Sequence, residues 1–170
     1  IDVVFLVMGL HRDYNPRRLE RYLLMSYESG AQPVVLLSKA DLLADPESRV
    51  AEIAALGHAA PVHAISVIGR RGANGDEPPD LSIVEGYLSP GRTAALLGSS
   101  GVGKSTLINA LLGTESLKTA AVRVSDQRGR HTTRHRQLII LPGRGLLIDT
   151  PGMRELQLWD IGEAAKESFE

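Results

Sequence analysis

The 170-residue sequence lacks cysteine, has almost no net charge and contains no long apolar run. Without cysteine, disulfides and thiolate metal sites are excluded within these residues. The formal net charge of −1 gives no global reason to bind nucleic acid or an anionic membrane, so any basic surface must be local. No apolar run approaches the roughly 18 residues of a membrane span, and no signal peptide is visible. We therefore expect a cytoplasmic protein that does not associate with a membrane.

The remaining composition is that of an ordinary globular domain. Hydrophobic residues make up 43% of the chain, and 170 residues suffice for a single domain with a proper core. The chain begins without methionine in an apparent buried strand, and it stops inside a helical pattern that starts after Trp159. We therefore expect residues 1–170 to be one domain of a longer protein.

Segments with the pattern of buried strands alternate with helical patterns. Helices are predicted after Asn15-Pro16 and Asp45-Pro46, and they should end near Gly30 and Gly57. Their expected buried faces are Leu19, Tyr22, Leu23 and Ser26 in the first helix, and Val50, Ile53, Ala54 and Leu56 in the second. Strands are predicted at residues 3–8, 33–37, 62–67, 93–97, 137–141 and 145–149, and further helices at 81–88 and from Ser105. The alternation predicts an α/β domain with a mostly parallel sheet flanked by helices.

Residues 98–105 fit the pattern G-x-x-x-x-G-K-[ST], which forms a phosphate-binding loop between a strand and a helix. Glycines permit backbone conformations in which consecutive N–H groups surround phosphates at the positive end of the helix dipole. Lys104 would contact the β- and γ-phosphates, and the Ser105 hydroxyl would coordinate Mg²⁺. The residues expected to bind nucleotide here are Gly98, Ser99, Ser100, Gly101, Val102, Gly103, Lys104, Ser105 and Thr106.

A second motif, D-x-x-G, runs from Asp149 to Gly152 at the end of a predicted strand. An aspartate in that place can hold Mg²⁺, and the glycine N–H can meet the γ-phosphate. Taken alone, the residues Asp-Thr-Pro-Gly could form a β-turn, but their position beyond a phosphate loop favours the nucleotide site.

The segment Ser38-Lys39-Ala40-Asp41 follows a predicted strand and resembles the guanine-recognition motif [NT]-K-x-D. The Asp41 carboxylate would accept hydrogen bonds from guanine N1–H and the exocyclic amine, a pattern that adenine does not offer. The Lys39 stem would cover the base plane. Ser38 stands where Asn or Thr is usual. Serine keeps a hydroxyl but has a shorter reach than asparagine. Ser66, near the end of the next strand, is a weaker candidate for a contact near the base.

A switch threonine is expected between the phosphate-loop helix and D-x-x-G. Thr133 is preferred over Thr132 because it directly precedes Arg134; its hydroxyl would bind Mg²⁺ and its N–H the γ-phosphate. The same stretch is basic, with Arg123, Arg128, Arg130, His131, Arg134, His135 and Arg136. It could face RNA or be a solvated loop, and the sequence favours neither.

The motifs come in an unusual order, because the guanine motif precedes the phosphate loop, whereas a Ras-like chain has the reverse order. Circular permutation explains this, since the termini of a compact domain usually lie close together and can be joined while the chain opens elsewhere. The ancestral ends would be joined through residues 69–91. Within that segment, residues 69–80 have the composition of a loop or linker.

Three runs accompany the permuted order: GSSGVGKSTLIN from Gly98, GRHTT from Gly129, and DTPGMREL from Asp149 followed by Leu158-Trp159. Together they resemble the RsgA (YjeQ) family over essentially all 170 residues. The resemblance implies a circularly permuted Ras-like P-loop GTPase domain of a factor that acts late in small ribosomal subunit maturation. It also implies an OB-fold and a zinc-binding domain outside this chain, zinc only in the latter, and the small subunit with its rRNA as partner. We expect a monomer.

The expected reaction converts GTP and water to GDP and phosphate, with Lys104, the loop amides and Mg²⁺ stabilising the transferring phosphoryl group. Ras-like proteins orient the water with a glutamine after D-x-x-G. This chain has Met153 there, so the isolated domain should hydrolyse GTP slowly. The resemblance implies that His131 takes this role once the ribosome orders the loop, with Thr133 and Gly152 at the γ-phosphate.

Two other classes of function stay open on the sequence alone. An ATP-using P-loop enzyme would give Asp41 no role and would show no guanine preference. A nucleotide-gated RNA-binding scaffold with incidental hydrolysis is compatible with Met153 and the basic stretch. A related permuted GTPase of the large subunit is disfavoured by the runs GRHTT and MRELQLW.

Overall fold

The computed structural model describes residues 1–11, 13–56, 59–68, 70–72, 75–77, 79–113 and 137–150. Their main feature is a six-stranded sheet with the order β3-β2-β1-β6-β8-β7. The strands are β1 (Val3–Gly9), β2 (Gln32–Ser38), β3 (Val62–Ile65), β6 (Thr93–Leu97), β7 (Gln137–Leu141) and β8 (Gly145–Asp149). All neighbouring pairs in this sheet are parallel except β7 and β8, which form an antiparallel hairpin. The mostly parallel sheet is thus confirmed.

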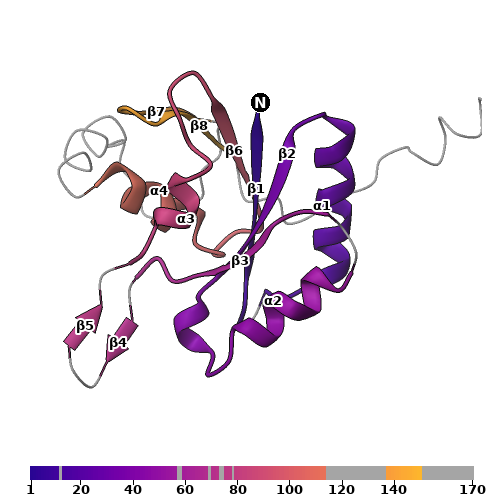
Figure 1. Ribbon diagram of the computed structural model, residues 1–170, viewed down its shortest axis with the longest axis vertical. Helices are drawn as coiled ribbons and strands as arrows, with labels where there is room; N and C mark the ends of the chain where they lie inside the picture. Colours follow the sequence, from indigo (N-terminus) through magenta and orange to yellow (C-terminus); the bar gives the residue numbers. More distant parts are fainter. Residues whose placement is uncertain are drawn as a thin grey trace, which may run out of the picture.

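Helices cover both faces of the sheet, with α1 and α2 on one side and α3 and α4 on the other (Figure 1). Their bounds are α1 (Pro16–Glu28), α2 (Glu47–Ala54), α3 (Ser82–Glu85) and α4 (Lys104–Leu112), and a short 3₁₀ helix, η1, spans Ala40–Leu42. Alternate side chains of β1 pack on opposite faces of the sheet. Phe5 belongs to the hydrophobic core on the side of α3 and α4, and Leu6 to the core on the side of α1 and α2. This double burial explains the uninterrupted apolar run of β1.

Helix α1 follows its sequence pattern closely. The Asn15 side chain accepts a hydrogen bond from the Arg18 N–H at 3.0 Å, and proline occupies the first turn, so the helix start is capped as predicted. The expected buried residues Leu19, Tyr22, Leu23 and Ser26 are all buried.

Other elements differ from their predictions. In α2 only Ile53 is fully buried, while Ala54 and Leu56 are exposed; the helix ends at Ala54, so Leu56 lies beyond it. The loop predicted at residues 69–80 contains a two-stranded antiparallel hairpin, β4 (Arg70–Gly72) and β5 (Gly75–Glu77), which is separate from the main sheet. Three-residue strands carry too short an alternation to be recognised. The joining of ancestral ends through residues 69–91 stays a prediction. No helix in the described part of the chain is long and apolar enough to cross a membrane.

Gly145, at the start of β8, provides a test of the packing beneath the hairpin. Its φ is +98°, and an added Cβ would overlap the backbone carbonyl oxygens of Arg92 and Ser89. We expect Gly145→Ala to lower the free energy of unfolding by about 2 kcal/mol or more, measured by urea denaturation. Gly143→Ala is the control, because Gly143 has φ +69° but open space around it, so its cost should stay near 1 kcal/mol. Equal costs would contradict the close approach at Gly145.

Candidate nucleotide-binding site

The candidate site lies where neighbouring parallel strands end. The guanine motif follows β2, the phosphate loop follows β6, and Asp149 is the last residue of β8. Because β2, β1, β6 and β8 are consecutive in the sheet, these three segments meet at one edge although they are far apart in sequence.

The phosphate loop depends on glycine where the backbone passes close to β1. A Cβ added at Gly98 would overlap the carbonyl oxygen of Val7, so no other residue fits there without movement. Gly103 has φ +105° and serves as the N-cap of α4, which places the first N–H groups of that helix at the end of the loop. The predicted strand–loop–helix is thus confirmed, and its geometry suits an anion at the helix N-terminus.

Lys104 is held inside this loop. Its ammonium donates to the carbonyl oxygens of Gly98 at 2.6 Å and Ser99 at 2.8 Å, and the residue is only 6% exposed. Burial lowers the pKa of Lys104, while the carboxylates of Asp149 and Asp13 oppose that shift. Two of the three ammonium protons are used within the loop, which leaves a third for a phosphate oxygen.

Asp149 is buried at the end of β8 beside Lys104. Burial raises the pKa of Asp149, and the Lys104 charge opposes the rise. Its Oδ1 has no hydrogen-bond partner within the described part of the chain. A buried carboxylate oxygen without a partner is costly, so Asp149 suits a bound cation or its water shell. The next residue, Thr150, is tied to the sheet by its hydroxyl, which donates to the Leu96 carbonyl oxygen at 2.6 Å.

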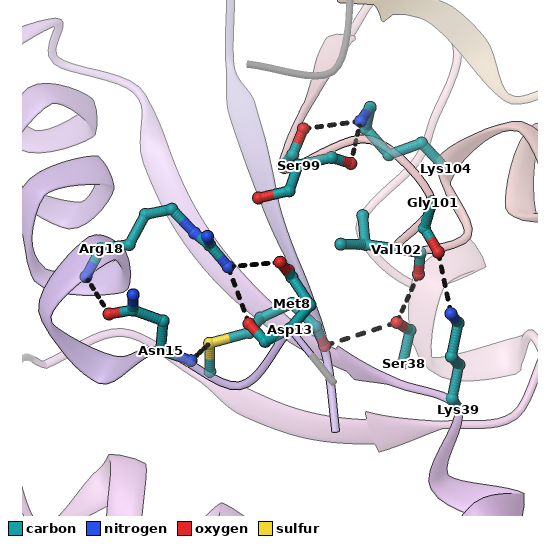
Figure 2. A network of polar contacts seen from close by, with 11 residues as sticks. Met8, Asp13, Asn15, Arg18, Ser38, Lys39, Ser99, Gly101, Val102 and Lys104 are labelled. Atoms are coloured by element: carbon teal, nitrogen blue, oxygen red, sulfur yellow. Dashed lines mark hydrogen bonds and ion pairs between the residues drawn. The ribbon is translucent and has the colours of Figure 1, made fainter. Parts of the chain in front are cut away.

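The guanine motif makes direct contact with the phosphate loop (Figure 2). The Ser38 hydroxyl donates to the Val102 carbonyl oxygen at 2.6 Å, and the Lys39 ammonium donates to the Gly101 carbonyl oxygen at 2.8 Å. Lys39 has a φ of +64°, the one positive value at a non-glycine residue in the described chain. This left-handed residue turns the backbone from β2 into η1 and aims the lysine stem along the loop.

Asp41 and Ser66, which the sequence places near the same base, are in direct contact. The Ser66 hydroxyl donates to Asp41 Oδ1 at 2.8 Å. The contact near the base that the sequence suggested for Ser66 stays a prediction, and its hydroxyl holds the Asp41 carboxylate.

Asp13 is a candidate functional residue that the sequence analysis missed. It lines a cavity of about 450 Å³ together with Gly9 of β1, Lys39, and Ser100 and Gly101 of the phosphate loop. Its Oδ1 forms an ion pair with Arg18 at 2.7 Å, and Arg18 also donates to the Asp13 carbonyl oxygen at 2.7 Å. Figure 2 shows Asp13 between Arg18 and the phosphate loop. The signal available in the sequence was its position just beyond β1, at the edge where ligands bind.

The structure does not test every predicted site residue. His131, Thr133 and Gly152 lie outside the described residues, as do Met153 and the basic stretch. Of the predicted Mg²⁺ ligands, only Ser105 and Asp149 are described. No group of three or more His, Cys, Asp or Glu residues that could hold a metal ion occurs among the described residues.

The ion pair of Asp13 and Arg18 should matter for stability, because Asp13 Oδ2 is buried and has no partner in the described chain. Arg18→Leu would leave both oxygens of this carboxylate without a cation. We expect a loss of about 1–3 kcal/mol in the free energy of unfolding, measured by urea denaturation. Glu52→Gln is the control, since the Arg49–Glu52 pair is nearly half exposed and its loss should change the free energy of unfolding much less. An Arg18→Leu protein as stable as the control would contradict this account.

Comparison with known proteins gives a consistent result. A sequence profile described as RsgA GTPase matches residues 1–159. The chain is 50% identical over 165 residues to a protein of Opitutus terrae named small ribosomal subunit biogenesis GTPase RsgA, covering 97% of this chain and 43% of that protein. A protein of the same name from Xanthomonas oryzae pv. oryzae is 52% identical over 169 residues, covering 99% of this chain and 45% of that protein. The chain thus spans less than half the length of these relatives.

Two solved structures share the fold. The crystal structure of YjeQ from Thermotoga maritima has a TM-score of 0.60 at 24% identity, covering 89% of this chain and 48% of that one. The structure of YloQ, described as a circularly permuted GTPase, has a TM-score of 0.59 at 24% identity, covering 95% and 48%. The permuted order, the phosphate loop joined to the guanine motif, and the match over residues 1–159 lead to one conclusion: the chain belongs to the RsgA GTPase family.

Proposed function

We propose that this chain is the domain of a small ribosomal subunit maturation factor that binds GTP with Mg²⁺ and hydrolyses it. The observation that carries the proposal is the pair of hydrogen bonds from Ser38 and Lys39 to the phosphate loop. These contacts support one site in which a guanine-recognition motif adjoins a phosphate cradle. The relatives' printed name supports the small subunit as the partner.

Each end of the nucleotide has a matching group. The Asp41 carboxylate accepts hydrogen bonds from guanine N1–H and the exocyclic amine, and the Ser66 hydroxyl keeps it oriented. The loop amides and the free proton of Lys104 stabilise negative charge on the phosphates.

The donor set fits a magnesium ion, which binds oxygen ligands. Asp149 offers a buried carboxylate oxygen without a partner in the described chain, and Ser105 is an exposed residue in the first turn of α4. We assign Ser105 and Asp149 to Mg²⁺, with Thr133 as a further ligand from the sequence pattern. When bound, the ion neutralises charge on the β- and γ-phosphate oxygens.

Base specificity provides a direct test. Asp41→Asn replaces a group with two acceptors by an amide with one acceptor and one donor, which matches xanthine N1–H and its 2-oxo group instead of guanine. We expect GTP affinity to fall at least about 100-fold and xanthosine triphosphate affinity to rise, measured by calorimetric titration. Asp45→Asn is the control, because Asp45 accepts from the Ser48 N–H outside the site. An Asp41→Asn protein that keeps its guanine preference would show that Asp41 does not contact the base.

Activation by the small subunit provides the second test. With Met153 in the place of the water-orienting glutamine, we expect slow hydrolysis by the full-length protein alone. Small subunits should raise the rate on the order of 100-fold by ordering the switch loop, with no comparable effect on ATP hydrolysis. His131→Ala should abolish the stimulation and keep GTP binding, whereas His135→Ala serves as a control from the same stretch. Stimulation that survives in His131→Ala would remove His131 from the mechanism, and an absence of stimulation would contradict the proposed partner.

A further inference from the structure

We propose that Ser38 acts as a tether for the phosphate loop and does not contact the base, so that guanine N7 is left unrecognised. Recognition by the motif is then confined to the edge of guanine that Asp41 contacts. The proposal rests on the proposed guanine site and defines its specificity more closely.

The hydrogen bonds of Ser38 support this assignment. Its hydroxyl is 2% exposed and donates to the Val102 carbonyl oxygen at 2.6 Å, and its second neighbour, the Met8 carbonyl oxygen at 3.4 Å, is also an acceptor. A serine hydroxyl has one proton. Because the proton is engaged by a buried carbonyl that needs a partner, none remains for a ligand.

The edge of guanine that carries N7 and O6 offers only hydrogen-bond acceptors. Guanine N7 and O6 accept hydrogen bonds, so only a donor can recognise N7. The asparagine usual at this position has two amide protons and can serve a loop carbonyl and N7 together, whereas serine must choose one of the two. Asp41 supplies acceptors only, and these match N1–H and the exocyclic amine. Lys39 directs its ammonium to Gly101, at the phosphate loop.

Two glycines flank the Ser38 hydroxyl. A Cβ added at either Gly9 or Gly103 would lie 4.0 Å from Ser38 Oγ, so the hydroxyl is flanked by two backbone segments that carry no side chain. An amide one atom longer can extend between them. The lack of an N7 contact is therefore a property of residue 38, and a single substitution can restore that contact.

The experiment compares GDP with 7-deaza-GDP, in which C–H replaces N7, by displacement of a fluorescent guanine nucleotide from the full-length protein. We expect the natural protein to bind the two within about twofold. Ser38→Asn should prefer GDP by about five- to tenfold, the value of one added hydrogen bond. Ser38→Thr keeps a single hydroxyl donor and should bind GDP and 7-deaza-GDP with similar affinity. Ser38→Ala should weaken the binding of both ligands by the same factor, because it removes the tether.

Three results would overturn the proposal. A loss of about tenfold or more for 7-deaza-GDP with the natural protein would show that N7 is contacted. A Ser38→Asn protein that binds GDP but does not discriminate would show that residue 38 does not face N7. A Ser38→Ala protein with undiminished affinity would show that there is no tether, and this variant decides the question if Ser38→Asn does not fold. Equal displacement by ADP and GDP is a separate outcome, which would overturn the proposed guanine site and this proposal with it.

Discussion

The site depends on the attachment of the guanine motif to the phosphate loop. Ser38 and Lys39 are consecutive residues at the end of β2, and they donate to the consecutive carbonyls of Val102 and Gly101, more than 60 positions along the chain. These bonds add to the constraints from Lys104, which donates to two carbonyls of the loop, and from the close approach of Gly98 to β1. With them, the phosphate loop is joined directly to the motif that we propose to contact the base.

The sheet explains why the order of the motifs does not matter for this attachment. β1 separates β2 from β6 by one strand, and all three run parallel, so their carboxyl ends lie at one edge whichever is made first. The same edge receives Asp149 from β8 and Asp13 from the segment after β1. Both carboxylates act on the Lys104 ammonium and offset part of the cost of burying its charge.

Features that depend on local patterns could be predicted from the sequence, and those that depend on distant contacts could not. Asn15-Pro16 and the spacing of Leu19 and Leu23 suffice to define α1, and the glycine pattern suffices for the phosphate loop. The acceptor of the Ser38 proton could not be predicted, because it comes from a loop that only the folded sheet brings near. Asp13 was missed although it follows β1, because the cavity that it lines with residues of that loop forms only in the folded chain. The roles of His131, Thr133 and Gly152 stay predictions.

The central claim is that one guanine nucleotide is bound by both halves of this site, and a crystal structure of the full-length protein with GDP and Mg²⁺ tests it most directly. The account predicts the base against the Asp41 carboxylate and the phosphates within residues 98–105, with Lys104 Nζ on a phosphate oxygen and Ser38 still on the Val102 carbonyl. Phosphates in the loop with the base turned away from Asp41 would contradict it.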